Sequence, residues 1–527
     1  MIFVPKRQLT YNDINGFLDD DKYKKMTNEE KACFMLKVVF KLKEFKSSKQ
    51  KNAILNAMER KHDTYACLAT GGGKSLCYQL PAITRKGVTI VFSPLLALIK
   101  DQMEGLTKLG IKCGSLISSS DKSLITSDLY SRNPTYQIIF TTPESSNNEK
   151  FLSLLRSLYM KGILKYFVVD EAHCISQWGH DFRHDYLLVG KIRNKYIGVP
   201  WIILTATAPK NVEDDIMKYL NCVDVKKFYG LLIRSNIYYD VVYEEYMGET
   251  GTINNHICNF VKNIDQEFKT IFNKSFPTYS GIIYVRTVKG CEKFSQYLKA
   301  AGINAEFFHG QMENNAKEEV YKRFINDKIQ VVVATTAFGM GINKSNVRFV
   351  LHLGPPDDLA SYYQESGRAG RDGRSCICRI YFSKNIKYRN EILIRSRISD
   401  VTANANTLLH MKEKRIDIMK NNFEQMIEYC ESLKCRHASL LLHFGRILKN
   451  TCQSYCDYCK DPNSVNDQLS KYMSHFDNLR KGAFEKNNEN DSTRKRKINE
   501  LSNHDESIPS NKIKKICSTN NDESTVF

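Results

Sequence analysis

The sequence of 527 residues has no apolar run of about 18 residues, the length that a helix needs to cross a membrane. Its first residues, MIFVPKRQLTYND, also lack the long apolar core of a secretory signal peptide. Both absences favour an intracellular protein. In a reducing compartment, most of its 16 cysteines are expected to be thiols rather than disulfides.

Acidic residues are under-represented, with 58 Asp and Glu against 77 Lys and Arg, which gives a formal net charge of +19. An excess of this size favours a polyanionic partner, because neutralising phosphates releases their condensed counterions. General solubility is the alternative explanation. From residue 471 on there are 11 Lys and Arg against 9 Asp and Glu, so most of the excess belongs to the preceding part of the chain.

Short β-branched apolar runs, each followed by polar residues, alternate with amphipathic segments in residues 31–222 and again in residues 223–390. This pattern predicts buried strands of parallel sheets joined by crossover helices. The expected strands are GVTIVFS (87–93), YQIIFTT (136–142), LKYFVVD (164–170), PWIILTA (200–206), GIIYVRT (281–287), AEFFHG (305–310), IQVVVATT (329–336) and VRFVLHL (347–353). The sequence therefore predicts an α/β fold with two tandem parallel-sheet domains and a cleft between them.

The other segments differ in composition. Residues 1–30 are polar and are expected to form an amino-terminal extension. Residues 391–470 are expected to form a small helical module that ends in a cysteine cluster. Residues 471–527 contain few large apolar side chains and cannot bury enough surface to offset the entropy of ordering, so we expect a disordered basic tail.

The segment ATGGGKS, residues 69–75, has the pattern of a phosphate-binding loop that leads into a helix. Its turn, whose backbone N–H groups would face phosphate oxygens, consists of Thr70, Gly71, Gly72 and Gly73. Lys74 would reach the β- and γ-phosphates of ATP, and Ser75 would bind Mg²⁺. The strict pattern has glycine where Leu68 stands, and a plain glycine-rich turn is the alternative.

The segment DEAH follows the expected strand 164–170 and carries two adjacent carboxylates. Asp170 would hold Mg²⁺, and Glu171 would position and deprotonate the attacking water. A surface acidic pair is the alternative, but the pairing with the phosphate loop favours the catalytic interpretation.

The segment YYQESGRAGRDG, residues 362–373, supplies the further catalytic candidates Gln364, Arg368 and Arg371. The two arginines are spaced to share one helix face. We expect Arg371 to reach across the cleft and stabilise charge on the γ-phosphate, with Arg368 also facing phosphate. An RNA-binding Gly/Arg segment is the alternative.

Taken in order, these motifs resemble those of superfamily 2 helicases, and specifically of the RecQ DNA helicases. The resemblance covers about residues 40–460 and rests on FKSSKQ (45–50), ATGGGKS, SPLLALIKDQ (93–102), TTPE (141–144), DEAH, TATA (205–208), GIIYV (281–285), TTAFGMGINK (335–344) and YYQESGRAGRDG. DEAH alone would suggest the DEAH-box RNA helicases, but those have Arg where this chain has Glu365. The resemblance implies two RecA-like domains, ATP and Mg²⁺ as cofactors, and DNA as partner.

The resemblance also gives expected roles to residues outside the phosphate loop. Gln50 would recognise adenine, with Lys46 and Lys49 beside it. The segments that border single-stranded DNA in the family contain Ser93, Pro94, Thr141, Thr142 and Glu144. Asn343 departs from the family, which usually has Asp there; an amide could still bond the ribose, whereas a role that needs the charge would be weakened.

The residues directly after DEAH resemble the aromatic-rich loop that senses single-stranded DNA in RecQ relatives. The loop candidates are Trp178, His180, Phe182 and Arg183. Aromatic rings stack on any base, and arginine adds phosphate or cation–π contact, although core packing of the rings is the alternative. Thr205 and Thr207 would link this surface to the ATP site, with simple capping of a strand end as the alternative. His173 would lie near the ATP site and link it to the other lobe.

Four cysteines, Cys435, Cys452, Cys456 and Cys459, follow the spacing C-x16-C-x3-C-x2-C. Four thiolates suit tetrahedral Zn²⁺. Cys430 is the rival ligand, and free core cysteines are the other alternative. The segment resembles the zinc module of RecQ helicases, and its spacing resembles the animal type 5 branch in a short form.

The expected function is that of an ATP-dependent DNA helicase that moves 3′-to-5′ on single strands and unwinds duplex or forked DNA in repair, recombination or replication. The polarity comes from the resemblance alone. We find no pattern for a winged-helix domain, so an alternative is a translocase or annealing protein with weak strand separation. A DNA-binding protein without ATP hydrolysis and an RNA substrate also remain open.

Two basic clusters lie in the expected tail, RKRK (494–497) and KIKK (512–515). They favour nuclear import and hence a location in the nucleus. A non-specific DNA-binding tail and a merely solvated charge run are the alternatives.

Overall fold

The structure is a computed structural model that describes residues 2, 4–5, 7–117, 121–176, 183–247, 251–339, 344–403, 409–448 and 452–474. Met1–Leu469 form one compact unit. The predictions for RKRK (494–497) and KIKK (512–515) lie outside the described residues. Within those residues, we find no helix that is both long and apolar enough to span a bilayer.

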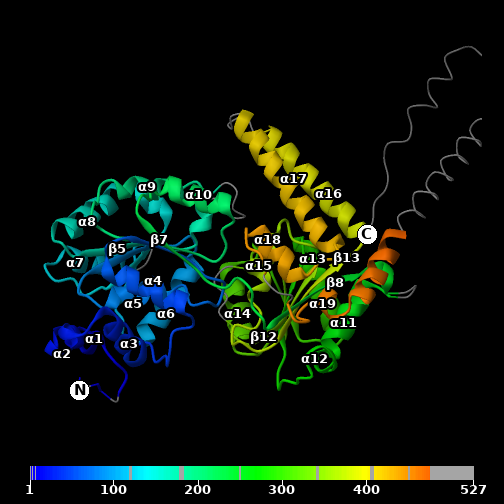
Figure 1. Ribbon diagram of the computed structural model, residues 1–527, viewed down its shortest axis with the longest axis horizontal. Coiled ribbons are helices and arrows are strands. Elements are labelled where there is room, and N and C mark those ends of the chain that lie inside the picture. The colour runs from blue at the N-terminus through cyan, green and yellow to red at the C-terminus, as the bar shows by residue number, and fades with distance from the viewer. Residues whose placement is uncertain are drawn as a thin grey trace, which may run out of the picture. The chain divides into compact units, whose positions relative to one another are not determined.

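The first part of the unit, which we call lobe 1, is built on a seven-stranded sheet of order β3-β4-β2-β5-β6-β1-β7 (Figure 1). Each neighbouring pair of strands runs parallel. The strands are β1 (Asp63–Cys67), β2 (Val88–Phe92), β3 (Cys113–Ser115), β4 (Ile138–Thr141), β5 (Leu164–Val169), β6 (Trp201–Thr205) and β7 (Val225–Tyr229).

Alternate residues of the strands point to opposite faces of the sheet and belong to two separate apolar clusters. Helices cover both faces and complete these clusters. The helices are α1 (Tyr11–Asp19), α2 (Asp21–Lys25), α3 (Asn28–Val38), α4 (Ser48–Glu59), α5 (Leu76–Ile83), α6 (Leu96–Lys108), α7 (Lys122–Tyr130), α8 (Glu149–Met160), α9 (Tyr186–Arg193) and α10 (Lys210–Tyr219). Residues 1–30, expected to be an extension, contribute α1 and α2, whose Phe17 and Tyr23 are buried in the first cluster.

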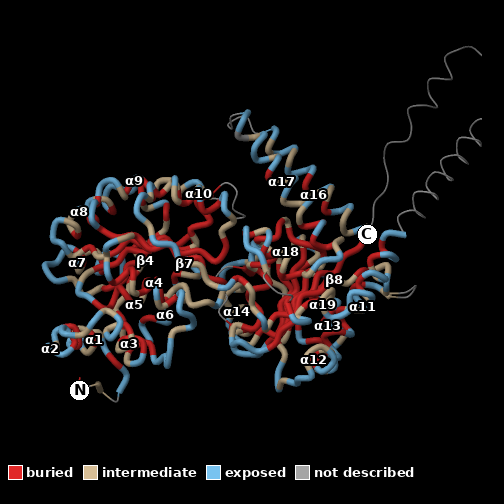
Figure 2. Tube along the Cα trace, viewed as in Figure 1, coloured by how far each residue is buried: buried red, intermediate tan, exposed pale blue. Residues whose placement is uncertain are grey.

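The second part, lobe 2, has a six-stranded parallel sheet of order β10-β11-β9-β12-β13-β8. Its strands are β8 (Ile237–Tyr243), β9 (Ser280–Tyr284), β10 (Ala305–Phe308), β11 (Val331–Ala334), β12 (Val347–Leu353) and β13 (Cys376–Phe382). Its helices are α11 (Ile253–Lys262), α12 (Ile264–Phe272), α13 (Val288–Ala300), α14 (Asn314–Ile325) and α15 (Leu359–Ser366). Figure 2 shows most strands of both sheets buried and the outer faces of the helices exposed.

A helical region follows lobe 2. It comprises α16 (Lys384–Ala403), α17 (Leu409–Glu431), α18 (Arg436–His443) and α19 (Asp457–Lys460), with α16 and α17 packed side by side. The region attaches to β8, the edge strand of the sheet: Tyr239 N donates to Tyr455 O at 3.2 Å, and Val241 N donates to Asp457 Oδ2 at 3.0 Å. Backbone groups at a sheet edge need partners, and this region supplies them.

All eight strands expected from apolar runs are present, as β2, β4, β5, β6, β9, β10, β11 and β12, which confirms the α/β fold with two parallel sheets. The apolar-run pattern does not predict β8 and β13, because each carries a charged residue at its centre. Asp240 and Arg379 lie opposite each other on the paired strands, with Arg379 Nη2 2.7 Å from Asp240 Oδ2. Both side chains are buried, and each is tolerated because the other neutralises it.

Replacing Arg379 with Met should therefore destabilise lobe 2 by about 3–5 kcal/mol, because it leaves the Asp240 carboxylate buried without its guanidinium. Urea unfolding followed by tyrosine fluorescence would measure the change. The double variant Arg379→Met with Asp240→Leu should recover most of the loss, and Lys269→Met, at an exposed ion pair, should shift the midpoint far less. An Arg379→Met midpoint equal to that of Lys269→Met would contradict the importance of the buried pair.

Candidate active site and metal centre

The phosphate loop connects β1 to α5 and depends on two glycines with positive φ, Gly71 at 80° and Gly73 at 83°. A Cβ at Gly73 would collide with Nε2 of Gln50. Leu68, which stands where the strict pattern has glycine, is buried in the core of lobe 1, and Gly230 leaves room for it, since a Cβ there would lie 2.8 Å from Leu68 Cδ2. The turn thus begins after Leu68, and its glycines keep the geometry of a phosphate cradle.

Two side chains from the segment FKSSKQ brace the loop from outside. Gln50 Nε2 donates to Gly73 O at 2.9 Å, and Lys46 Nζ donates to Gly71 O at 2.9 Å. Gln50 is positioned because it lies in the first turn of α4, where its N–H donates to the N-cap Ser47 Oγ at 3.1 Å. Lys49 is exposed on the same helix. The adenine contact expected of Gln50 stays a prediction.

The carboxylates of DEAH lie at the carboxyl end of β5. Asp170 Oδ1 accepts from Glu171 N at 3.0 Å, and Asp170 O accepts from Tyr186 Oη at 2.8 Å. Burial and, to a smaller extent, the Glu171 carboxylate raise the pKa of Asp170 to about 7, with Lys74 acting in the opposite direction. A divalent cation would remove this penalty, so the buried carboxylate fits the expected Mg²⁺ ligand.

Glu171 has a left-handed backbone with φ of 48°, a strained conformation of the kind that is common at functional sites. Its Oε2 lies 3.4 Å from His173 Nδ1, which in turn lies 3.3 Å from Thr205 Oγ1. Thr205 Oγ1 donates to Thr207 O at 2.8 Å. A continuous polar chain therefore runs from the DEAH carboxylate to the TATA segment that follows β6.

Ser75 has a partner that sequence reasoning missed. Its Oγ accepts from Gln102 Nε2 at 3.0 Å, and Gln102 lies on α6. Gln102 is the last residue of the quoted motif SPLLALIKDQ, so its place in that motif is the one signal that could have found it.

The arginine segment of lobe 2 lies against the phosphate loop of lobe 1. A Cβ at Gly71 would lie 3.7 Å from Arg371 Cγ, and a Cβ at Gly367 would lie 3.3 Å from Thr70 Cβ. Arg234, which belongs to no motif, supports the segment by donating from Nη1 to Gly367 O at 2.9 Å. Of the other expected members, Arg368 is buried at 4% exposure and Gln364 is half-buried on α15.

These cations are close enough to affect one another. Burial, together with the charges of Arg368 and Arg234, lowers the pKa of Arg371 to about 10. Burial also lowers the pKa of Lys46, and the charges of Arg234 and Arg371 add to that effect. Gathering positive charges beside a glycine-rich loop costs electrostatic free energy, and a bound polyphosphate would offset that cost.

The residues expected to border DNA differ in their accessibility. Ser93, Pro94 and Thr141 are buried, Thr142 is half-buried and Glu144 is exposed. Arg183 Nη1 donates to Pro94 O at 2.8 Å, which joins the end of the aromatic-rich loop to the segment after β2. Four of the predicted site residues lie outside the described residues: Trp178, His180, Phe182 and Asn343.

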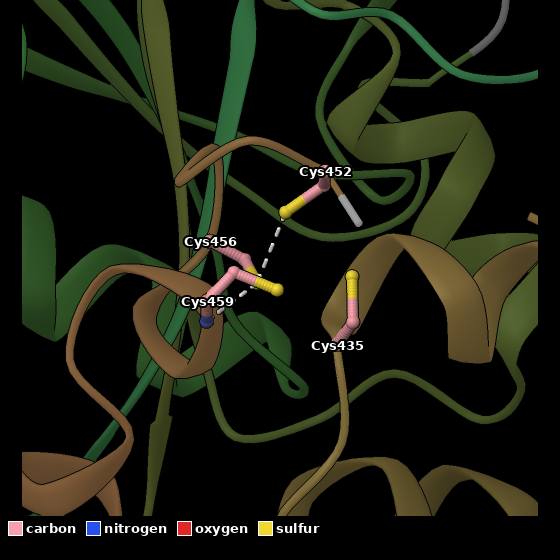
Figure 3. Close-up of side chains that lie close together, drawn as sticks. All are labelled: Cys435, Cys452, Cys456 and Cys459. Atoms are coloured by element: carbon pink, nitrogen blue, oxygen red, sulfur yellow. Dashed lines mark hydrogen bonds between the residues drawn. The ribbon is translucent and has the colours of Figure 1, made fainter. Parts of the chain in front are cut away.

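The predicted cysteine cluster is present in the helical region, and Figure 3 shows its four side chains converging on one point. The sulfurs of Cys435, Cys452, Cys456 and Cys459 all lie within 4.8 Å of one another. Ligands at the Zn–S distance of about 2.3 Å stand about 3.8 Å apart in a tetrahedron, so the set fits Zn²⁺. Among the described residues the rival Cys430 is not in this set; it is buried in α17.

Three families match the chain in the order of its parts. Residues 47–215 match the family described as DEAD/DEAH box helicase, residues 262–373 the helicase conserved C-terminal domain, and residues 393–460 the RecQ zinc-binding family. The last match contains all four cysteines of the cluster, which supports the assignment of Zn²⁺ to it.

Two curated relatives match most of the chain. ATP-dependent DNA helicase Q5 of Rattus norvegicus is 36% identical over 450 residues, which are 84% of this chain and 44% of that protein. ATP-dependent DNA helicase RecQ of Bacillus subtilis (strain 168) is 34% identical over 439 residues, which are 83% of this chain and 68% of that protein. The chain thus spans under half the length of its Q5 relative and about two thirds of the bacterial one.

Solved structures share the fold at low sequence identity. The DUF1998 helicase MrfA bound to DNA has a TM-score of 0.52 at 16% identity, covering 73% of this chain and 55% of that one. Dbp5 of S. cerevisiae bound to RNA and ADP BeF3 has a TM-score of 0.50 at 17% identity, covering 76% of this chain and 99% of that one. Both likenesses show the two-lobed fold alone.

Replacing Cys452 with Ser should abolish zinc binding, because three thiolates and a hydroxyl make a far weaker site for this ion. Purified protein should contain about one zinc per chain before the change and almost none after it, as measured by atomic emission. Cys430→Ser is the matched control and should keep its zinc. Loss of zinc from Cys430→Ser alone would show that the ligand set is wrong.

Asp170→Asn should stabilise the protein without added divalent cations more at pH 8 than at pH 5. The pKa of Asp170 is raised from 3.8 to about 7, so the folded state keeps it protonated at pH 5 and ionised at pH 8. Stability is therefore lost as pH rises from about 4 to 7, and Asn removes that loss. Urea midpoints at the two pH values would measure it, with exposed Asp21→Asn as control; an equal gain at both would contradict the raised pKa.

Proposed function

The chain belongs to the RecQ family of DNA helicases, and we propose from this that it is an ATP-dependent DNA helicase. It moves 3′-to-5′ along single-stranded DNA and unwinds duplex or forked DNA in repair, recombination or replication. The nucleus is its proposed location, in keeping with the eukaryotic Q5 relative and the basic clusters of the tail.

The observation that carries this proposal is the position of Arg371 against the phosphate loop. Its Cγ lies within van der Waals reach of a Cβ placed at Gly71, although the two residues belong to different lobes. In the proposed reaction, Lys74 and the loop hold the β- and γ-phosphates, and Arg371 neutralises the charge that spreads over the γ-phosphate. After hydrolysis, release of inorganic phosphate takes that charge out of the site and weakens the attraction that holds the lobes together.

When bound, Mg²⁺ would supply positive charge that offsets the charge developing on the transferred phosphate. Ser75 and Asp170 are its proposed ligands, and Gln102 orients the hydroxyl of Ser75. Glu171 accepts a proton from the attacking water, and the strained backbone at this residue directs its carboxylate toward His173.

Coupling to DNA follows from the polar chain that leaves the ATP site. Glu171 contacts His173, and His173 contacts Thr205, so a shift of either partner changes the position of the proposed general base. Further along the chain from DEAH, Arg183 donates to the carbonyl of Pro94, in the segment after β2. A DNA strand that displaces Arg183 would thus move both the chain after DEAH and the segment after β2.

Lys74→Ala should reduce ATPase activity stimulated by single-stranded DNA at least about 100-fold, and Arg371→Ala by about 10³-fold. Each variant removes a positive charge that stabilises the negative phosphates in the transition state. A coupled phosphate-release assay with and without a single-stranded oligonucleotide would measure this. Lys191→Ala, at an exposed position on α9, is the matched control.

Strand separation needs its own measurement on a forked duplex with a 3′ tail, beside displacement of a protein from single-stranded DNA. Unwinding by the wild type and its loss in Lys74→Ala is the expected result. Displacement without unwinding would show that the protein is a translocase rather than a helicase. Near-normal turnover in Lys74→Ala would refute the assigned ATP site.

A further inference from the structure

A cavity of about 370 Å³ lies apart from the phosphate loop, where lobe 1 faces the helical region. Lobe 1 contributes His173, Thr207 and the start of α10, the start of α15 contributes Leu359, and α17, α18 and the segment between them form the remaining walls. Its volume falls in the range of about 300–1,000 Å³ that is typical of sites for small organic groups. None of the roles described above uses this space.

The lining suits an uncharged, planar group rather than a phosphate. Amide side chains dominate its polar part, namely Asn211, Asn421, Asn422 and Gln425. Lys434 also lines the cavity, but its Nζ lies 2.8 Å from Glu428 Oε1, so that charge is already neutralised. Leu359, Ile418 and Leu442 supply an apolar surface on which a flat ring can pack.

Tyr429 adds an aromatic ring to the wall of the cavity. It lines the cavity from α17 and is 2% exposed. The ring is held by Tyr362 at 5.4 Å between centroids and by the Arg436 guanidinium at 5.6 Å, so this part of the wall is rigid. A flat ring can pack against such a wall.

The cavity also reaches the polar chain of the ATP site. His173, which forms part of its wall, has Nδ1 3.4 Å from Glu171 Oε2 and 3.3 Å from Thr205 Oγ1. A group that enters the cavity can therefore press on His173 and move the proposed general base. A site that only bound the DNA strand would not need a contact with His173.

We propose that the cavity receives one nucleobase of single-stranded DNA and reports its arrival to Glu171. This inference rests on the proposed function, and it adds a base-binding subsite formed by the zinc-bearing helical region. Amide side chains pair with base edges through a donor and an acceptor at once, and adenine suits Asn and Gln best. Among the described lining residues Lys434 is paired with Glu428, and Asp358 adds a carboxylate, so the cavity favours the base over the backbone phosphate.

Asn422→Trp fills the cavity from α17 and tests the proposal, with Glu424→Trp on the same helix, outside the lining, as the matched control. The readout is the DNA concentration that half-saturates ATPase, measured with an oligo(dA) strand and with an abasic strand of equal length. We expect the abasic-to-dA ratio of these concentrations to fall at least about threefold in Asn422→Trp, and to stay at the wild-type value in Glu424→Trp.

A ratio in Asn422→Trp equal to that of the control would overturn the subsite. The proposed function fails separately, because it requires the wild type to show DNA-stimulated ATPase at all. Asn422→Ala, which removes the amide without adding bulk, should lower the ratio as well, and zinc content would show that each variant keeps the folded helical region.

Photocrosslinking of the wild-type protein tests the location directly. A strand that contains 5-iododeoxyuridine joins to aromatic side chains near the modified base on irradiation. Mass spectrometry of the wild-type digest should find the strand on the peptide that contains Tyr429, and the signal should be reduced in Asn422→Trp. Crosslinks that map only to other parts of the chain would show that no base enters this cavity.

Discussion

Repulsion between like charges at the phosphate loop is the constraint on which much of this structure depends. Lys46, Arg234 and Arg371 come from both lobes, and burial and mutual repulsion lower the pKa values of Lys46 and Arg371. Backbone carbonyls hold Lys46 and Arg234 in place, at Gly71 and Gly367. The arrangement stores an unfavourable electrostatic free energy that a triphosphate would relieve, and hydrolysis would restore part of it.

The helical region that carries the zinc site has a structural role: it fixes the positions of the elements around it. Its Arg436 is fully buried and bonds Asp457, with Nε 2.9 Å from Oδ1, while the other oxygen of Asp457 accepts from β8. The cysteines therefore fix α18 and α19 against the edge of the second sheet. Because α17 precedes α18 by only a few residues, the same attachment sets the walls of the cavity beside His173. A structural metal thus determines geometry close to the proposed catalytic carboxylate.

The sequence predicts those parts of the fold and site whose information is local. Uniformly apolar strands, the glycine loop and the four cysteines are each recognisable within a few residues. β8 and β13 escape, because Asp240 and Arg379 interrupt their apolar pattern and are neutralised by a residue more than a hundred positions away. The sequence also does not predict the role of Arg234, because its partner is distant in the chain: only the folded structure brings this isolated arginine to Gly367. The role of Cys430 also needed the structure, since spacing alone does not say which way α17 turns its residues.

The stretch that begins at DEAH shows why one segment can serve two sites. Asp170 directly follows the buried strand β5, and a left-handed turn with φ of 48° comes next, at Glu171. This turn directs the carboxylate of Glu171 toward His173 instead of along the strand, and it carries the chain on to Arg183, which bonds the segment after β2. An ordinary helical backbone at Glu171 would separate these contacts. The strained backbone at Glu171 therefore places the proposed general base in contact with His173, within the polar chain that reaches Thr205.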